Sequence, residues 1–486
     1  MRKQTKLVAV LSAAALLAIG ASMTSFAASG WAQEDGTWVY LDSSGDRVYD
    51  TWKKSGSSYF YLNEDGEMAT NAIIDDGENK YYVDASGARV VNQWISVENE
   101  DNETIGDNED ISTIWYYFGS SGKANKEGVK TVNGKKYIFD DNGYMLCGWQ
   151  EYEGDLYYLG DENEGWAYTG WQFLELDEDI EDDDYDDEEW FYFKPSNGKA
   201  YVNSRKYISG KYYTFDENGV MQDKWVVGTP GAPASEDSAR YREENGAQET
   251  GWIYAYPIDD PDEEGDDQYW FYLDSKGVPF NLNGADTQIL EFKDGTRYDM
   301  AETEIAKKGN EKWKDPINNV ATKVIKSKTY LFNDKGEMQT GVFIFDYYVS
   351  RTGGVVLEPG IYYFNKDSGS GQGAMATGKT TVSYDGDNYN YYFQKDGSAY
   401  RNYIADGALY DGLGERVDAE DGNSYDLVDI PEGAVISIKG SSKVVEGPST
   451  VIVNSSGKVK KSGTVKIDGY KYTVNDYVVT DIEAVD

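Results

Sequence analysis

The sequence predicts an all-β protein: a β-solenoid of tandem β-hairpin repeats with loop insertions and a small C-terminal β-module. The first observation behind this prediction is a phrase of aromatic residues and glycine that returns along the chain, beginning as GWAQEDGTWVYLDSSG at Gly30. Its leading positions, Trp31, Trp52, Ile73 and Trp94, recur about every 21 residues, which is typical of stacked repeats. The second observation is composition: 42 Tyr, 16 Phe and 13 Trp accompany one Cys, so we expect aromatic packing rather than disulfides to stabilise the fold.

Residues 1–27 are predicted to be a secretory signal peptide. A basic start over Arg2–Lys6 precedes an apolar stretch, Leu7–Ile19, and small residues around Ala27 favour cleavage there. The apolar stretch is too short to span a bilayer and no second long one follows, so no membrane insertion is expected. The C-terminus has no sorting-type tail, and we therefore expect a secreted, extracellular protein that associates non-covalently with the cell wall or surface.

Residues 28–417 are predicted to form the repeats, each a strand, a turn and a second strand. The second strand carries an aromatic segment, as in WVYL at Trp38 and YFYL at Tyr59, and ends in a turn of Asp or Asn with Gly. Alternating side chains bounded by such turns are the signature of β-hairpins. Acidic insertions, the longest at Leu176–Trp190, are expected to be loops that project from the stack. Only the insertion DMAETEIAKKG, beginning at Asp299, has a composition that tolerates a short helix.

Residues 418–486 are predicted to form a small β-module or a set of capping copies. The repeated phrase fades here, although VIVNSSGKVKKSGTVKIDGYKYTVNDYVV from Val451 keeps a strand-like alternation. A cap is expected because the last repeat would otherwise expose an apolar face.

The charge of the chain restricts its partners. The formal net charge is −42, from 87 acidic and 45 basic residues. This charge repels nucleic-acid phosphates and anionic lipid head groups, so no nucleic-acid partner is expected. Quaternary amines, basic wall components and neutral sugars remain compatible with it.

The phrases GWAQEDGTWVYLDSSG and TWKKSGSSYFYLNEDGEM resemble the cell-wall-binding repeat family, which includes choline-binding modules and glucan-binding repeats. The resemblance covers most of the chain after the signal peptide. It implies hairpins that wind into a β-solenoid, with ligand sites between neighbouring hairpins. The partner implied is a cell-wall polymer or polysaccharide, either a choline-substituted polymer or a glucan, and no cofactor is expected.

In the choline-binding branch of that family the ligand pocket is a box of aromatic rings. Carried onto this chain, the resemblance implies a first box of Trp31, Trp38 and Tyr61 and a second box of Trp52, Tyr59 and Tyr82 with Met68. A quaternary ammonium among such rings gains cation–π attraction, and sugars stack on the same rings. Met68 also fits the role of a core residue. Later copies depart from the pattern, with Ile138 and Thr214 where a third ring is needed, and this favours a broader wall-polymer or glucan ligand there.

The sequence argues against catalysis. Histidine is absent, which excludes Ser-His-Asp and Cys-His sites and His-containing zinc centres. Cys147 lies in an apolar run without a partner base and is predicted to be a small buried residue. The acidic run Asp182–Glu189 does not match an EF-hand, so we interpret it as a solvated charge run and predict no metal site.

We therefore expect a non-enzymatic binding protein, with two alternatives left open. The first is the substrate-binding part of a secreted glycan- or wall-active hydrolase, which would need a pair of carboxylates. The second is a structural surface or adhesin protein whose rings pack internally and leave no open ligand site.

Overall fold

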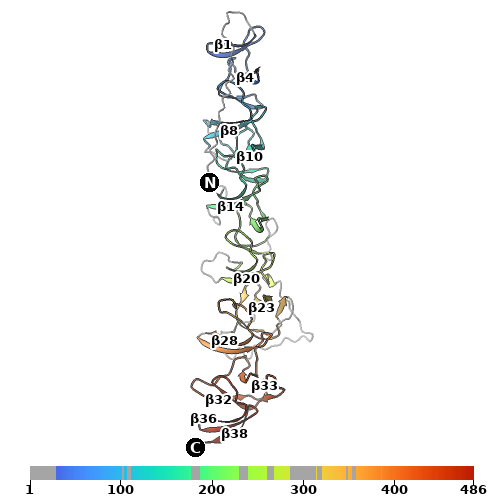
Figure 1. Ribbon diagram of the computed structural model, residues 1–486, viewed down its shortest axis with the longest axis vertical. Coiled ribbons are helices and arrows are strands. Elements are labelled where there is room, and N and C mark those ends of the chain that lie inside the picture. The colour runs from blue at the N-terminus through green and yellow to red at the C-terminus, as the bar shows by residue number, and fades with distance from the viewer. Residues whose placement is uncertain are drawn as a thin grey trace. The chain divides into compact units, whose positions relative to one another are not determined.

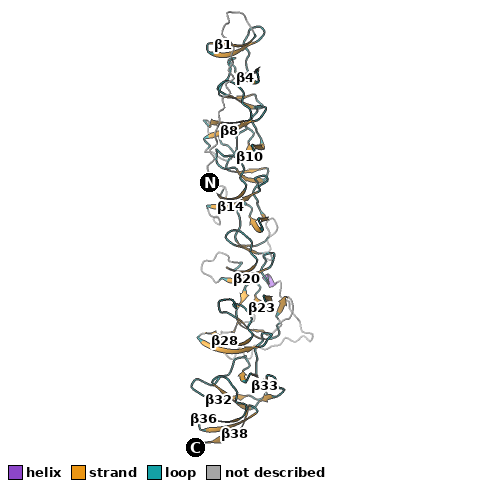
Figure 2. Cartoon of the chain, in the orientation of Figure 1, coloured by secondary structure: helices purple, strands orange, loops and turns teal. Residues whose placement is uncertain are grey.

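The computed structural model describes residues 29–100, 103–106, 111–176, 187–228, 239–259, 268–284, 313–314, 320–345, 349–352, 357–384 and 386–485. The predicted signal peptide, the insertion at Asp299 and most of the acidic run from Asp182 lie outside these residues. Within the described residues, strands dominate and helix is limited to the 3-10 turn η2 (Leu282–Gly284) (Figure 2). The predicted all-β class with tandem hairpins is confirmed.

The chain divides into two compact units, one comprising the residues up to Lys206 with Thr214–Met221 and the other comprising Tyr207–Tyr213 with Gln222–Asp486. Most sheets are antiparallel hairpins of two consecutive strands (Figure 1). The strands of the earlier part of the chain are β1 (Gly30–Glu34), β2 (Thr37–Leu41), β3 (Thr51–Ser55), β4 (Ser58–Leu62), β5 (Ala72–Asp75), β6 (Lys80–Val83), β7 (Gln93–Glu98), β8 (Thr113–Phe118), β9 (Gly128–Val132), β10 (Lys135–Phe139), β11 (Trp149–Tyr152), β12 (Asp155–Tyr158), β13 (Gly170–Glu175), β14 (Glu188–Phe193), β15 (Ser204–Ile208) and β16 (Lys211–Phe215).

The later strands are β17 (Lys224–Val226), β18 (Arg240–Arg242), β19 (Gly251–Ala255), β20 (Tyr269–Leu273), β21 (Trp313–Lys314), β22 (Ala321–Ile325), β23 (Lys328–Phe332), β24 (Met338–Gln339), β25 (Gly341–Phe345), β26 (Ser350–Thr352), β27 (Gly360–Phe364), β28 (Gly378–Tyr384), β29 (Asp387–Phe393), β30 (Tyr403–Ala405), β31 (Ala408–Tyr410), β32 (Tyr425–Ile430), β33 (Val435–Ile438), β34 (Val444–Glu446), β35 (Ser449–Asn454), β36 (Gly463–Ile467), β37 (Tyr470–Asn475) and β38 (Val478–Ala484).

Two kinds of turn fix each copy. The two strands of a hairpin are joined by short turns such as Asp35-Gly36, whose φ angles of 50° and 91° are both positive, as a type I′ turn requires. After the second strand an Asp or Asn side chain closes the next turn. The carboxylate oxygen of Asp42, for example, accepts the backbone N–H groups of Ser44 at 2.7 Å and Asp46 at 3.0 Å.

A repeated backbone hydrogen bond joins each hairpin to the one before it. The donor is the N–H of the second residue after the turn glycine, and we call this place the junction position. Its acceptor is the carbonyl of the first residue in the aromatic segment of the preceding hairpin, not of the donor's own hairpin. Met68 donates to Trp38 at 2.8 Å and Arg89 donates to Tyr59 at 2.8 Å. The same bond recurs within the later unit, where Ala399 donates to Ile361. Hairpins therefore stack on their chain neighbours within each unit, as predicted for a solenoid.

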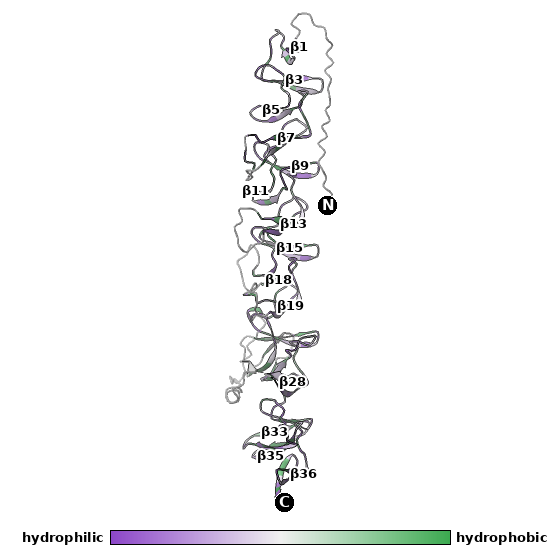
Figure 3. Ribbon diagram, turned by 90° about the vertical axis from the view of Figure 1, so that its left-hand side faces the viewer, coloured by the Kyte–Doolittle hydropathy of each residue, from purple (hydrophilic) through white to green (hydrophobic). Residues whose placement is uncertain are grey.

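Strand alternation separates a buried face from a ring-bearing face. In β4 the side chains of Phe60 and Leu62 are buried, whereas the alternating Tyr59 and Tyr61 are half-buried. Hydrophobic and hydrophilic residues are accordingly interspersed along the strands (Figure 3). This pattern puts the predicted box rings on the side of the hairpin that remains partly open to solvent.

The C-terminal strands continue the sheet structure beyond residue 418. β32 pairs with β35 in antiparallel fashion, and β36, β37 and β38 form a three-stranded sheet. β30 pairs in parallel with β33, and Ile404 and Leu409 share a core with Ile436 and Val445. Residues on both sides of position 418 thus pack together.

Candidate functional site

The leading tryptophans lie between neighbouring hairpins. Strand register puts each of them opposite the last ring of its own aromatic segment, as in the pairs Trp31 with Tyr40 and Trp52 with Tyr61. The second ring contact comes from the middle residue of the next segment: Phe60 lies 5.3 Å from Trp31, between ring centroids. These edge-on contacts bury ring area between copies and so stabilise the stack.

In the first box the structure brings Trp31 and Trp38 to one face of the β1–β2 hairpin. Trp31 pairs with Tyr40 and Gln33 pairs with Trp38, so the two indoles are diagonal neighbours on that face. Both are half-buried, and the indole N–H of Trp31 is buried without a hydrogen-bond partner. Lys53 lies over Tyr40 at 5.1 Å, but no lysine or arginine of the described residues lies over Trp31 or Trp38.

The third predicted member of the first box, Tyr61, packs against the leading tryptophan of its own hairpin. Its ring centroid is 5.2 Å from that of Trp52, and both rings lie beside the buried cluster of Ile74, Tyr81 and Val83. The ring that the structure brings to Trp31 from the second hairpin is Phe60.

The second box contains a cation of the chain itself. The guanidinium carbon of Arg89 lies 4.3 Å from the ring centroid of Tyr59, 5.4 Å from Trp52 and 5.5 Å from Tyr81. The predicted residues Trp52 and Tyr59 are therefore brought together, but around Arg89. The predicted Tyr82 lies 6.2 Å from Phe118 and packs with the core of the following hairpin.

Met68 is placed by its backbone at the first box. Its N–H donates to the carbonyl of Trp38, and its thioether lies against the turn glycine Gly87 of the third hairpin. Arg89 holds the same junction position one copy later. Sequence reasoning missed Phe60, Tyr81 and Arg89, although the appearance of Arg where the preceding copy has Met was a visible signal.

In later copies, additional rings pack against the leading tryptophan. Trp94 lies 4.7 Å from Tyr137 and 5.1 Å from Tyr117, and Phe139 stacks on it at 5.9 Å. Ile138 and Thr214, which interrupt the predicted boxes, are buried at 1% and 0% exposure. In these copies the predicted third position belongs to the core.

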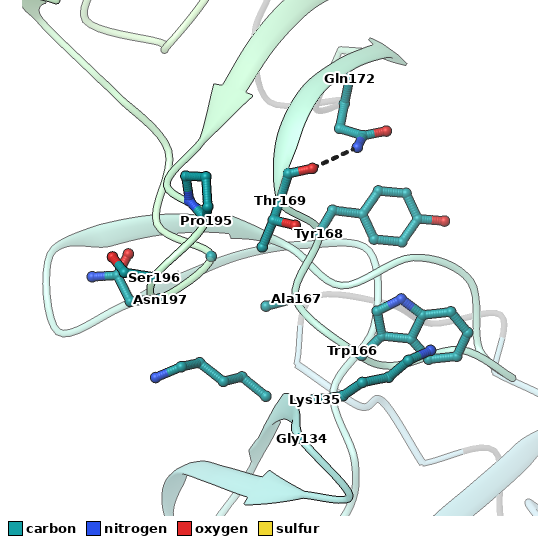
Figure 4. Close-up of a pocket in the computed structure, with 12 residues that line it drawn as sticks. Gly134, Lys135, Trp166, Ala167, Tyr168, Thr169, Gln172, Pro195, Ser196 and Asn197 are labelled. Atoms are coloured by element: carbon teal, nitrogen blue, oxygen red, sulfur yellow. Dashed lines mark hydrogen bonds between the residues drawn. The ribbon is translucent and has the colours of Figure 1, made fainter. Parts of the chain in front are cut away.

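A pocket of about 470 Å³ lies beside Trp166 in the first unit. Figure 4 shows the Lys135 side chain lying along the indole of Trp166, with Tyr168 and Gln172 nearby and Pro195, Ser196 and Asn197 supplied by the neighbouring turn. The Lys135 ammonium is 3.0 Å from the ring centroid, and burial lowers the pKa of this lysine. Gln172 donates to the carbonyl of Thr169 at 3.0 Å (Figure 4). The pocket combines rings and polar groups, but a resident cation covers its indole.

A second ring pocket, of about 550 Å³, lies beside Tyr392 and Tyr400 in the later unit. The Lys439 ammonium is 4.4 Å from the Tyr392 ring centroid and donates to the Tyr392 hydroxyl at 2.6 Å. That hydrogen bond is the main reason why the pKa of Lys439 is raised. Here too a side chain of the protein covers the aromatic face.

The described residues contain no group of three or more His, Cys, Asp and Glu side chains arranged to hold a metal ion. Of the predicted acidic run, Asp187–Glu189 are described and its earlier part is not. Cys147 is buried, as predicted, and burial raises its thiol pKa to about 11. Among the described residues, no helix has the length and apolar content that crossing a membrane requires.

Comparisons with protein families match the N-terminal copies. Residues 48–89 match a choline-binding repeat, and residues 29–46 and 110–124 match a putative cell wall binding repeat. Both predicted boxes fall within or beside these segments. No curated protein matches the chain in sequence.

Three of the solved structures that match this chain are of proteins from Streptococcus pneumoniae. The modular autolysin LytC is 18% identical over 64% of this chain, with a TM-score of 0.34, and the match spans 52% of the autolysin. Choline binding protein F is 19% identical over 80% of this chain and 98% of its own, with a TM-score of 0.28. The choline-binding domain of CbpL is 26% identical over 40% of this chain and 98% of its own, with a TM-score of 0.18. At these low TM-scores the superpositions assign no residue of this chain to a known site.

Proposed function

We propose that the chain is a secreted, non-catalytic member of the cell-wall-binding repeat family that attaches to a choline-substituted wall polymer or a glucan. Attachment is non-covalent and uses aromatic sites between hairpins. The protein stays in this way on the outside of the cell wall.

The observation that carries the proposal is the pair of half-buried indoles of Trp31 and Trp38 on one face of the first hairpin. No cation of the described residues covers them, in contrast to the rings of Tyr59 and Trp166. A quaternary ammonium held between two indoles gains about 2 kcal/mol or more once it is desolvated. The net charge of −42 further favours a cationic ligand over an anionic one.

The two alternatives make different demands on the chain. A hydrolase needs two carboxylates in a cleft, whereas the rings of the two pockets at Trp166 and Tyr392 are covered by lysines, and the Tyr392 pocket has one carboxylate, Asp396, in its lining. A purely structural protein would use its rings for packing alone, whereas Trp38 is half-buried and no cation of the described residues lies over it, which supports the binding function.

The experiment is retention of the protein on purified choline-bearing cell walls and on insoluble glucan, with free choline as competitor. We expect retention on walls, release by choline, and loss of most retention in Trp31→Ala and Trp38→Ala. The control is Tyr470→Ala, which removes a ring that is 48% exposed in the C-terminal sheet. Retention on glucan alone, unaffected by choline, would assign the ligand to the glucan class. Retention on neither matrix would reject the proposal.

A further inference from the structure

Arg89 occupies the second aromatic box in the place where a ligand cation would sit. We propose that this arginine is a built-in occupant: it closes the box to choline in the native chain, so that replacing it with methionine opens a new choline site. The inference deepens the proposed function, on which it rests, by stating which box accepts ligand.

The geometry is that of a cation in an aromatic cage. Three rings lie within 5.5 Å of the guanidinium carbon, and they come from two neighbouring hairpins: Trp52 and Tyr59 from β3 and β4, and Tyr81 from β6. The Nε atom of Arg89 is buried without a hydrogen-bond partner, as is the indole Nε1 of Trp52. The guanidinium is therefore stabilised inside the box by its contacts with the rings and not by a hydrogen bond from Nε.

The backbone holds Arg89 in this place. Its N–H donates to the carbonyl of Tyr59 at 2.8 Å, so the side chain starts from the edge of the box. On its far side lies Gly122, and a Cβ atom there would stand 2.7 Å from Arg89 Nε. The next hairpin thus leaves room for the arginine and for little else.

Arg47 shows what an arginine does at the same position of an earlier copy. It also stands two residues after a turn glycine, Gly45, but its guanidinium binds the carboxylate of Glu34, with Nε 3.0 Å from Oε2. Among the described residues, no aromatic ring lies under the Arg47 guanidinium. Occupation of the rings is therefore a property of Arg89 and not of every arginine in this position.

A tethered cation is a strong competitor. Because a side chain on a short tether has an effective concentration on the order of millimolar, free choline must displace Arg89 before it can enter the rings. Charge repulsion between the guanidinium and a second cation adds to this cost. The first box has no such competitor, since Met68 holds its junction position.

Methionine is a replacement that the fold already accepts. Met68, Met145 and Met221 all hold junction positions, and each makes the same backbone hydrogen bond to the preceding hairpin. Arg89→Met therefore keeps the junction bond while it removes the guanidinium and its unpartnered buried Nε. The cation that remains near the box is Lys54, whose ammonium lies farther out, 5.6 Å from the Tyr59 ring centroid.

The test is calorimetric titration of the full chain with choline for the native protein, Arg89→Met and Arg47→Met. We expect Arg89→Met to bind one more equivalent of choline than the native protein and Arg47→Met to bind no more. The latter variant removes the same charge from the same repeat position, so it controls for net charge. An unchanged stoichiometry in Arg89→Met, or an equal gain in Arg47→Met, would overturn the inference.

The outcomes separate this inference from the proposed function. If the native protein binds choline and Arg89→Met adds no site, the inference fails and the function stands. If the native protein binds none and Arg89→Met binds one equivalent, the second box is closed as inferred and choline attachment of the native chain is rejected.

A second test needs no ligand and measures the NMR signals of the Arg89 side chain in the native protein. The rings should shift these signals upfield, and unshifted signals would count against occupation of the box by Arg89.

Discussion

The thioether of Met68 in the second copy lies against Gly87 of the third, so closely that a Cβ atom on Gly87 would stand 2.8 Å from the Met68 sulfur. The same arrangement recurs where Met375 faces Gly397 and where Met145 faces Gly165. Each of these turn glycines therefore has two roles. It provides the positive φ of the turn, 76° at Gly87, and it admits the junction side chain of the preceding copy.

Gly87→Ala should destabilise the protein by more than the turn conformation alone explains. A positive φ costs a residue with a Cβ about 1–2 kcal/mol, and moving the flexible thioether of Met68 out of the way adds about 1 kcal/mol, the lower end of overpacking costs. Gly154→Ala is the matched control, because Gly154 has the same φ of 76° but no atom within 4 Å of the place that an alanine Cβ would take. Urea unfolding of both variants measures the difference, and equal losses would show that the Met68 contact carries no strain.

Local sequence patterns were sufficient to predict the hairpins. The recurrence of Trp31, Trp52 and Trp94 predicted the copies, and short polar turns with Gly, such as Asp35-Gly36, predicted two-strand units, which the structure has. These features depend on contacts within one hairpin, where residue type and spacing determine the conformation.

The composition of each box could not be predicted from the same patterns. Strand register already assigns Tyr61 to Trp52, because the two residues are directly opposed in one hairpin. The ring from the next hairpin depends on how far one copy is rotated against the previous one, which no spacing within a copy encodes. For this reason the middle residues Phe60 and Tyr81 meet the leading tryptophans, while Tyr82 packs onward against Phe118.

Alkaline pH should destabilise the first unit through Tyr116. Burial raises the pKa of this tyrosine from 10.0 to about 12, and its side chain is 4% exposed. Above pH 10 the phenol ionises in the unfolded chain but not in the folded one, so the unfolded state loses a proton first and stability falls as pH rises towards 12. Below pH 10 this contribution is fully present.

Tyr116→Phe should flatten that pH dependence, because the variant keeps the ring and removes the ionisable group. Unfolding free energies of both proteins at neutral and alkaline pH provide the measurement. If the native protein and Tyr116→Phe lost the same amount of unfolding free energy between neutral pH and pH 12, the buried placement of Tyr116 would be contradicted.

Cys147 should be inert in the folded protein. Its side chain is 5% exposed, and burial raises the thiol pKa from 9.0 to about 11, so little of the reactive thiolate forms at neutral pH. We expect a thiol reagent to modify Cys147 slowly in the native protein and rapidly in denaturant. Equal rates in the two conditions would place the thiol at the surface.

Substitutions of Phe60 and Trp38, two rings of the first two hairpins, should distinguish a packing role from a ligand-binding role. Phe60 is 3% exposed and lies edge-on to Trp31, so Phe60→Ala should cost about 3–5 kcal/mol of unfolding free energy. Trp38 is half-buried, and Trp38→Ala should cost less than half as much while it removes wall retention. A structural protein with no open site would lose stability in both variants and retention in neither. Measuring the unfolding free energy and wall retention of each variant therefore distinguishes a ligand-bearing indole from one that only packs.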